Sequence, residues 1–93
     1  MNKQSSHKKI FFKYQAPEAK AVFLAGSFNG WNISATPLKK DKEGNWFTKM
    51  ELFPGTYEYL YVVDGEWWRD DPNCKMHQYN KYGGQNCLLI VEE

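Results

Sequence analysis

The amino-acid sequence predicts an all-β protein, folded as an antiparallel sandwich or a small barrel. Apolar and polar residues alternate with a period of two in five short runs, and Gly, Pro, Asn or Asp residues separate those runs. No segment shows the spacing of an amphipathic helix. The chain has 93 residues, the size of one domain. We therefore expect a flexible polar lead over residues 1–8 and a single domain over residues 9–93.

Each alternating run is expected to form one strand, with successive side chains on opposite faces. In chain order, the alternating positions are Ile10, Phe12 and Tyr14; Val22 and Leu24; Trp46, Thr48, Met50 and Leu52; Tyr57, Tyr59, Tyr61 and Val63; and a last run from Cys87 to Val91. Trp46 begins an alternating run that continues with Met50 and Leu52, so we expect its indole in the core.

The dipeptide Asp64-Gly65 is the clearest turn signal, because both residue types tolerate the positive φ angles of a type I′ hairpin. It follows the fourth run and precedes a short segment, residues 66–69. This turn brings two adjacent indoles, Trp67 and Trp68, to the rim of the same sheet. Neighbouring strand residues point to opposite faces, so one indole should face the core and the other solvent, unless a β-bulge intervenes.

Another turn, residues 26–32 (Gly-Ser-Phe-Asn-Gly-Trp-Asn), places Trp31 at a loop tip. Aromatic residues make up 17% of the chain, more than a small core buries, so some are expected on the surface for binding. Exposed indoles on a rigid β-scaffold suit the flat C–H face of a glucose ring, and asparagine amides both donate and accept hydrogen bonds with hydroxyls. Trp31, Asn86 and either Trp67 or Trp68 fit this chemistry if their loops converge.

The charge balance argues against two classes of partner. Twelve Lys and Arg residues against eleven Asp and Glu give a net charge of +1. Nucleic acids and anionic membranes reward a strongly basic surface, so we expect no nucleic acid and no membrane partner. The polar start of the chain lacks the apolar segment of a secretory signal, and no run approaches the roughly 20 apolar residues of a membrane span. These features predict a cytoplasmic location.

Catalysis has little support in the sequence. Glu66, Asp70 and Asp71 offer clustered carboxylates of the kind that glycosidases use. However, Asp-Asp-Pro-Asn is ordinary turn chemistry, and we expect these acids to be exposed and solvated. Ser27 has no nearby histidine to serve as its base. We therefore expect a protein that is not an enzyme.

Metal binding is equally weakly supported. Cys74 and His77 have a Cys-x-x-His spacing, but a structural zinc site needs about four ligands, and only Cys87 and the distant His7 remain. We expect no metal and no other cofactor. Cys74 and Cys87 could pair, but in a chain without an export signal two reduced thiols are the expected state.

Several motifs in a fixed order resemble one family. They are Val22-Phe23-Leu24-Ala25-Gly26-Ser27-Phe28-Asn29-Gly30-Trp31, Pro37-Leu38, Trp46, Leu52-Phe53-Pro54-Gly55, Tyr57-Glu58-Tyr59, Val63-Asp64-Gly65-Glu66-Trp67, Asp71-Pro72 and Gly83-Gly84-Gln85-Asn86. Over about residues 9–91 the chain is similar to carbohydrate-binding module family 48. That family includes the N-terminal domains of isoamylases and branching enzymes, and the glycogen-binding domain of the AMP-activated protein kinase β subunit.

The resemblance implies an immunoglobulin-like, early-set β-sandwich with a site for α-1,4-glucan built from two tryptophans. Trp31 corresponds to the first tryptophan. Counting forward from Asp-Gly makes Trp67 the second, whereas counting back from Asp-Pro makes it Trp68, and Trp67 is the preferred assignment. Asn86 falls on the asparagine that hydrogen-bonds sugar hydroxyls. Tyr82 falls on the residue that inserts into the curve of the glucan, where the kinase module has an aliphatic side chain.

The sequence departs from the kinase modules at two positions. Leu60 stands where those modules place a lysine, and a charged hydrogen bond of about 1.5–3 kcal/mol is lost with it. We expect this to weaken binding by roughly one to two decades, unless Lys39, Lys40 or Lys81 replaces the lysine. Gly84 stands where the kinase modules often carry a hydroxyl residue.

Three functions remain open on the sequence alone. The leading one is non-catalytic binding of an α-glucan polysaccharide or oligosaccharide such as glycogen, starch or maltodextrin. The second is a protein-interaction domain with weak or lost sugar binding, for which Leu60 would be exposed beside Trp31 as part of an apolar partner surface. The third is an accessory part of a glycogen-metabolising enzyme, either in the same polypeptide or as a separate partner.

Overall fold

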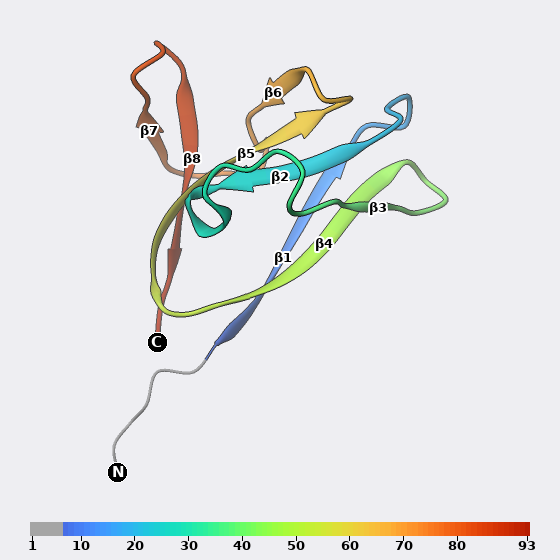
Figure 1. Cartoon of the computed structure of the whole chain (residues 1–93). Coiled ribbons are helices and arrows are strands. Elements are labelled where there is room, and N and C mark those ends of the chain that lie inside the picture. Colours follow the sequence, from blue (N-terminus) through green and yellow to red (C-terminus); the bar gives the residue numbers. More distant parts are fainter. Residues whose placement is uncertain (1–6) are drawn as a thin grey trace.

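The fold is a sandwich of two antiparallel β-sheets, as the alternating pattern predicts (Figure 1). The structure is a computed structural model and describes residues 7–93. Most of the expected polar lead, residues 1–6, lies outside the described residues, and Lys8 already belongs to the first strand. No helix in residues 7–93 has the length and apolar character needed to cross a membrane.

The smaller sheet has three strands in the order β1-β4-β3. Its strands are β1 (Lys8–Gln15), β4 (Asn45–Leu52) and β3 (Lys39–Lys40). The segment before β3 first pairs with the other sheet, because Leu38 N donates to Val22 O at 2.9 Å. The chain therefore crosses from one sheet to the other at this point and closes one side of the sandwich.

The larger sheet has five strands, with β2-β5-β8-β7 in order and β6 also paired with β5. The strands are β2 (Val22–Gly26), β5 (Gly55–Val63), β6 (Trp67–Arg69), β7 (His77–Tyr79) and β8 (Gln85–Val91). β2 pairs with residues 59–63 of β5. β8 pairs with residues 55–59 and β6 with residues 61–63. Strands β8 and β6 therefore follow one another along the same edge of β5.

Aromatic contacts join the two sheets in the core. The ring of Phe12 on β1 packs edge-on against Tyr59 on β5 at 5.1 Å between centroids, and Tyr14 packs against Tyr61 at 4.8 Å. Trp46 is 7% exposed, which confirms the prediction that its indole is buried. Its Nε1–H donates to Ala16 O at 2.9 Å, so the one polar atom of the ring is satisfied.

The five predicted strands are all present, and the Asp64-Gly65 hairpin is confirmed. Both turn residues have positive φ, 54° and 73°, as a type I′ turn requires. The alternating pattern does not reveal β3, β7 or the short 3₁₀ helix η1 (Ser27–Asn29). These elements are two or three residues long and none contains a buried residue, so no apolar period marks them.

A buried acid ties the end of β6 to the core. Asp71 is 9% exposed, so the expectation that it is solvated is wrong. Its Oδ2 accepts the hydroxyl protons of Tyr59 at 2.6 Å and Tyr61 at 3.5 Å, and its Oδ1 accepts Asn73 N–H at 2.9 Å. These partners compensate the loss of water around the carboxylate, which explains how an acid is accommodated there.

The tyrosine pair predicts a loss of stability in alkaline solution. Burial, together with the nearby Asp71 carboxylate, raises the pKa of Tyr59 and Tyr61 far above the ordinary value of 10.0. The folded state then holds both protons above about pH 10, where the unfolded chain releases them, so the stability contributed by each tyrosine is complete below that pH and falls as pH rises. The expected loss is about 1.4 kcal/mol per pH unit per tyrosine.

Urea unfolding between about pH 9 and about pH 11.5 measures this loss. Tyr59→Phe removes one of the two titrating groups and should roughly halve the slope of unfolding free energy against pH. An unfolding free energy that stays constant over the range would contradict the expected effect of the tyrosine pair.

Candidate functional site

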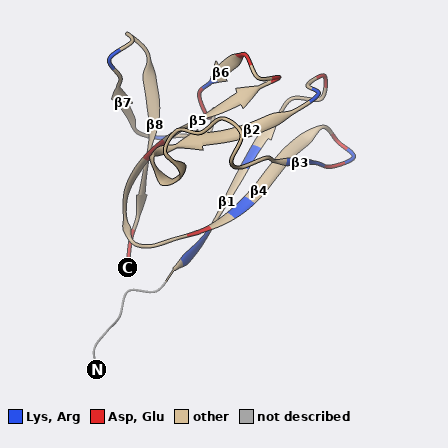
Figure 2. Cartoon of the chain, viewed as in Figure 1, with Lys and Arg blue, Asp and Glu red and all other residues tan. Residues whose placement is uncertain are grey.

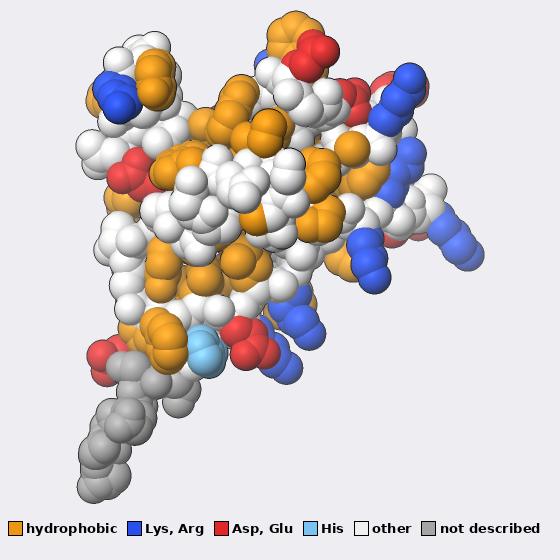
Figure 3. All heavy atoms as spheres, in the orientation of Figure 1, with side chains coloured by type: hydrophobic (Ala, Val, Ile, Leu, Met, Phe, Trp, Pro, Cys, Tyr) orange, Lys and Arg blue, Asp and Glu red, His pale blue; other side chains and the backbone are white. Residues whose placement is uncertain are grey.

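A groove of about 1150 Å³ lies on the five-stranded sheet, on the face turned away from the core. In Figure 3 hydrophobic side chains gather on the surface between the β7–β8 hairpin and β6. The groove is lined from four parts of the chain: Ser27 and Trp31 after β2, Glu58 and Leu60 on β5, Trp68 and Asp70 in and after β6, and residues 80–82 and 84–86 around the β7–β8 turn. Four of the five residues proposed from the sequence, Trp31, Trp68, Tyr82 and Asn86, line it.

Trp31 is held by a tight turn that follows β2. Gly26 ends the strand, and a Cβ there would lie 2.6 Å from Glu58 O, so only glycine allows this approach. Asn29 donates to Leu24 O at 2.9 Å and accepts Gly26 N–H at 3.1 Å. Trp31 itself has φ 60°, a left-handed conformation that is uncommon for a bulky residue. The turn thus imposes backbone strain on the residue whose half-buried indole lines the groove.

Trp68, rather than Trp67, lines the groove. Glu66 N–H donates to Val63 O at 3.1 Å, but the residue that pairs with Val63 across the two strands is Trp67. Glu66 is therefore an extra residue between the turn and β6. Trp68 pairs with Val62, which shares its face of β5 with the groove residues. Trp67 points to the opposite side, where Arg69 Cζ lies 5.3 Å from the ring centroid. The structure therefore corrects the preferred assignment.

The expectation that one of the two indoles faces the core is also wrong. Trp67 is 53% exposed and Trp68 is 47% exposed. The strand β6 has only three residues and pairs with β5 alone among the described strands. Trp67 is directed to the inner side of the sheet, yet about half of it stays exposed.

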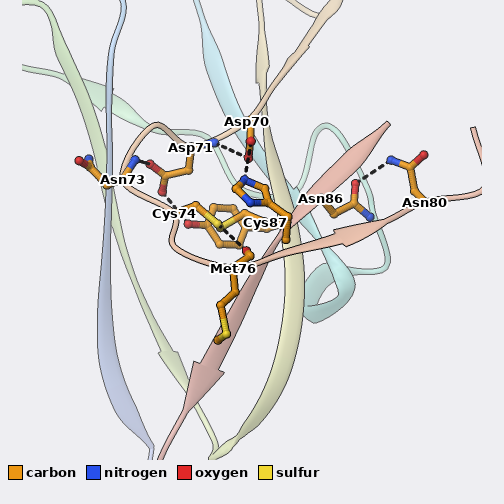
Figure 4. Close-up of polar contacts among 10 residues, drawn as sticks. Asp70, Asp71, Asn73, Cys74, Met76, Asn80, Asn86 and Cys87 are labelled. Carbon is orange, nitrogen blue, oxygen red and sulfur yellow. Dashed lines mark hydrogen bonds and ion pairs between the residues drawn. A yellow bond between two sulfur atoms is a disulfide. The ribbon is translucent and has the colours of Figure 1, made fainter. Parts of the chain in front are cut away.

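Asn86 is the polar centre of the groove and belongs to a chain of amides (Figure 4). Its side chain is almost buried, with 6% exposure. Its Nδ2 donates to Glu58 Oε1 at 3.1 Å, and its Oδ1 accepts Asn80 Nδ2–H at 3.0 Å. An amide nitrogen carries two protons and the oxygen has two lone pairs, so each keeps one position for a ligand hydroxyl.

Asn80 also holds the loop that carries Tyr82. Its Oδ1 accepts Tyr82 N–H at 2.9 Å and Gly84 N–H at 3.0 Å. Tyr82 is 84% exposed at the rim of the groove, and Lys81 Nζ lies 5.5 Å from the Tyr82 ring centroid. Asn80 therefore fixes two groove elements at once, the Tyr82 loop and the orientation of the Asn86 amide.

Leu60 is 9% exposed and lies in the groove lining, so the expectation of an exposed apolar contact surface at this position is not met. Among the three lysines considered as replacements for a charged donor, Lys81 lines the groove. Lys39 and Lys40 are on β3 in the other sheet, and Lys40 Nζ donates to Pro17 O at 3.1 Å. A Cβ at Gly84 would meet Asn80 Nδ2 at 3.5 Å, an ordinary contact, so this position has room for a hydroxyl side chain.

Cys74 and Cys87 form a disulfide, which corrects the expectation of two free thiols (Figure 4). Their Cα atoms are 5.9 Å apart, within the usual span of such a bridge. Asp70 lies beside both sulfur atoms, but disulfide sulfurs are not thiolates and do not supply the zinc ligands considered above. Asp70 instead pairs with His77, at 2.7 Å from Oδ2 to Nε2.

Sequence reasoning missed two groove residues that hold others in place, Asn80 and Glu58. An Asn followed by Lys-Tyr-Gly-Gly is a turn signal, and it could have suggested that the Asn80 side chain caps the loop. Nothing in the sequence marks Glu58 as the partner of Asn86, because the two residues meet only through the pairing of β5 with β8.

We expect Asn80→Ala to lower the affinity of the groove for its ligand by about tenfold, because the Tyr82 loop and the Asn86 amide both lose a hydrogen-bonding partner. Asn80→Asp is the matched variant. It keeps the acceptor for the two loop N–H groups but loses the donor to Asn86, and it should retain the loop while weakening binding less. Calorimetric titration with a maltodextrin measures the affinity of both variants. Wild-type affinity in Asn80→Ala would contradict the role of Asn80 in positioning the Tyr82 loop and the Asn86 amide.

Comparison with known proteins identifies the family. A family model described as the glycogen recognition site of AMP-activated protein kinase matches residues 8–93. The chain is 41% identical over 73 residues to protein PTST homolog 2, chloroplastic, of Arabidopsis thaliana, covering 78% of this chain and 13% of that protein. It is 38% identical over 85 residues to the amyloplastic phosphoglucan phosphatase DSP4 of Castanea sativa, covering 90% and 22%.

A solved structure shows the same fold. The maltogenic amylase from S. marinus superimposes with a TM-score of 0.76 at 23% identity, over 91% of this chain and 14% of the amylase. The chain thus spans less than a quarter of each of these three proteins. The family match over nearly its whole length agrees with the motifs noted in the sequence, and the chain belongs to the family described as the glycogen recognition site of AMP-activated protein kinase.

Proposed function

We propose that this module binds α-1,4-glucan, such as glycogen, starch or maltodextrin, without catalysing a reaction on it. One observation carries the proposal: the indoles of Trp31, from the turn after β2, and Trp68, from β6, line the same groove as the Asn86 amide. Family membership supports the same ligand class.

The groove offers both kinds of contact that a glucan needs. Trp31 and Trp68 provide apolar faces for the C–H surfaces of glucose rings, and burying one such side chain contributes about 1.5–3 kcal/mol. Asn86 offers one free donor and one free acceptor position, and the exposed ring of Tyr82 stands at the rim to contact the curved chain. Lys81 is the one cation of the lining and supplies a further donor.

The same arrangement predicts weak affinity. The groove is open, and Leu60 supplies no hydrogen bond. Two of the four hydrogen-bonding positions of the Asn86 amide are already used within the protein. A few hydrogen bonds and two stacking faces must also overcome the entropy lost by a flexible glucan. We expect a Kd on the order of 10 μM to 1 mM.

Binding without catalysis is supported by the state of the groove carboxylates. Glu58 Oε1 accepts the Asn86 amide, while Asp70 pairs with His77 and its Oδ1 accepts Asp71 N–H at 2.9 Å. Both acids therefore have structural partners, whereas a glycosidase needs one acid free to protonate and another free to attack or activate water.

The kind of enzyme with which this module acts can be proposed from its relatives. One relative is named a phosphoglucan phosphatase and the similar solved structure a maltogenic amylase, and each is several times longer than this chain. We infer that this module delivers a glucan-metabolising enzyme, in the same or a partner polypeptide, to its polymer. Weak, reversible binding suits such a role because the polymer presents many sites at once.

Isothermal titration with maltoheptaose tests the ligand class, and cellohexaose is the matched control. Both are glucose oligomers, but the β-1,4 chain is flat and does not curve around Tyr82. Maltoheptaose should bind in the stated range and cellohexaose at least about tenfold more weakly. No heat or spectral change with millimolar maltoheptaose, in a folded sample, would exclude the proposed function.

A further inference from the structure

The outer face of the three-stranded sheet carries an unusual combination of exposed aromatic rings and lysines. Phe11 is 73% exposed and Phe47 is 46% exposed, although both lie in the middle of strands. The strand register surrounds them with four exposed lysines: Lys13 and Lys39 lie opposite Phe47, Lys49 lies opposite Phe11, and Lys9 is two residues from Phe11. We call these six residues the basic-aromatic face.

The positive charge on this face exceeds the negative charge beside it. Glu51, opposite Lys9, is the one acid on the same side of these strands. Within residues 7–93 the only ion pair is between His77 and Asp70, so none of the four ammonium groups has a carboxylate partner there. Figure 2 shows lysine positions along β1, β3 and β4, and the overall charge of the chain is nevertheless only +1. Positive charge is therefore concentrated on one side of a nearly neutral molecule.

The two rings also border a hollow. A shallow pocket of about 380 Å³ lies here, and its lining residues are Phe11, Pro37, Lys39, Phe47, Thr48 and Lys49. Its apolar floor and ammonium rim suit one bulky apolar side chain flanked by carboxylates. Burying one such side chain contributes about 1.5–3 kcal/mol, and the flanking charges set orientation and association rate.

We propose that the basic-aromatic face is a docking surface for an acidic segment of a partner protein that carries an aromatic or large aliphatic residue between carboxylates. The hollow has room for one bulky side chain and favours a protein segment, while the overall charge of only +1 argues against a nucleic acid partner. The face lies on the opposite side of the sandwich from the groove of Trp31 and Trp68. Protein docking and glucan binding can therefore occur together, and this proposal does not depend on the glucan proposal.

Amide chemical shifts of the labelled protein test the docking surface with a defined probe, a peptide containing Asp-Glu-Phe-Glu-Asp. The matched controls are the same peptide with Ser in place of Phe, the charge-reversed peptide Lys-Lys-Phe-Lys-Lys, and an oligothymidylate as a non-protein polyanion. The acidic aromatic peptide should shift amides of β1, β3 and β4, and should bind about fivefold or more weakly when salt rises from about 50 to about 300 mM. Both peptide controls should bind at least about fivefold more weakly.

The double variant Lys13→Glu/Lys49→Glu should lower peptide affinity by about tenfold or more. Both side chains are exposed, so the variant should fold, and its affinity for maltoheptaose should remain that of the wild type. Shifts confined to the groove, no shifts at millimolar peptide, or tighter binding of the oligothymidylate than of the peptide would each overturn the proposal.

Discussion

Removing the indole of Trp31 or Trp68 is expected to weaken maltoheptaose binding by roughly 10- to 150-fold, because each ring contributes about 1.5–3 kcal/mol of apolar burial against a glucose unit. Both side chains line the groove. Neither belongs to the core cluster, so Trp31→Ala and Trp68→Ala should unfold at nearly the wild-type urea concentration. Calorimetric titration of the two variants measures the loss of affinity.

Trp67→Ala is the matched control, since Trp67 is the neighbour of Trp68 in the chain and is exposed to a similar degree. It points away from the groove toward Arg69. We expect its affinity to stay within about twofold of the wild type. A loss in Trp67→Ala as large as the loss in Trp68→Ala would contradict the assignment of the platforms. Trp31→Gly is a second variant at the loop, because glycine adopts φ 60° without strain.

Reduction of the Cys74–Cys87 disulfide is expected to destabilise the fold by about 3 kcal/mol, because the bridge closes a loop of 13 residues and restricts the unfolded chain. For a domain of this size the melting temperature should fall by roughly 10–20 °C. The bridge also ties the segment after β6 to β8 directly beside Asn86, so glucan affinity should fall with it. Thermal unfolding with and without a dithiol reductant measures the effect.

The double variant Cys74→Ser/Cys87→Ser separates the bridge from side effects of the reductant. It should match the reduced wild type and should not respond to reductant. A melting temperature unchanged by reduction would contradict the stabilising role.

The cytoplasmic location that we propose from the sequence favours reduced cysteines. Alkylation of the protein as it is extracted from its own cells tests this, since complete oxidation of the pair would oppose that location.

Much of the fold could be predicted because its strands and turns are specified by residues that are close together in the sequence. Strand positions such as Phe12, Leu24 and Trp46 are apolar with a period of two, and their burial follows from that period. The turn at Asp64-Gly65 was predictable because its backbone demands residues that tolerate positive φ. These signals lie within a few residues of the element that they specify.

The details of the site that sequence reasoning could not decide depend on register or on distant contacts. Whether Trp67 or Trp68 faces the groove depends on one extra residue, Glu66, in the turn before β6. The place of that residue is visible only in the pairing of β6 with β5. The pairing of Cys74 with Cys87 depends on β7 lying beside β8. The chemistry of exposed indoles and amides and the family resemblance both indicated Trp31 and Asn86, but neither indicated Asn80.

The most direct test of the central claim is a maltoheptaose titration observed at the four tryptophan indole N–H signals in a nitrogen–proton correlation spectrum. The chain has four tryptophans, so each signal can be assigned with one substitution. The structure predicts that the signals of Trp31 and Trp68 shift together with one affinity, while those of Trp46 and Trp67 stay in place. Movement of Trp67 without Trp68, or no movement of Trp31 at saturating sugar, would contradict it.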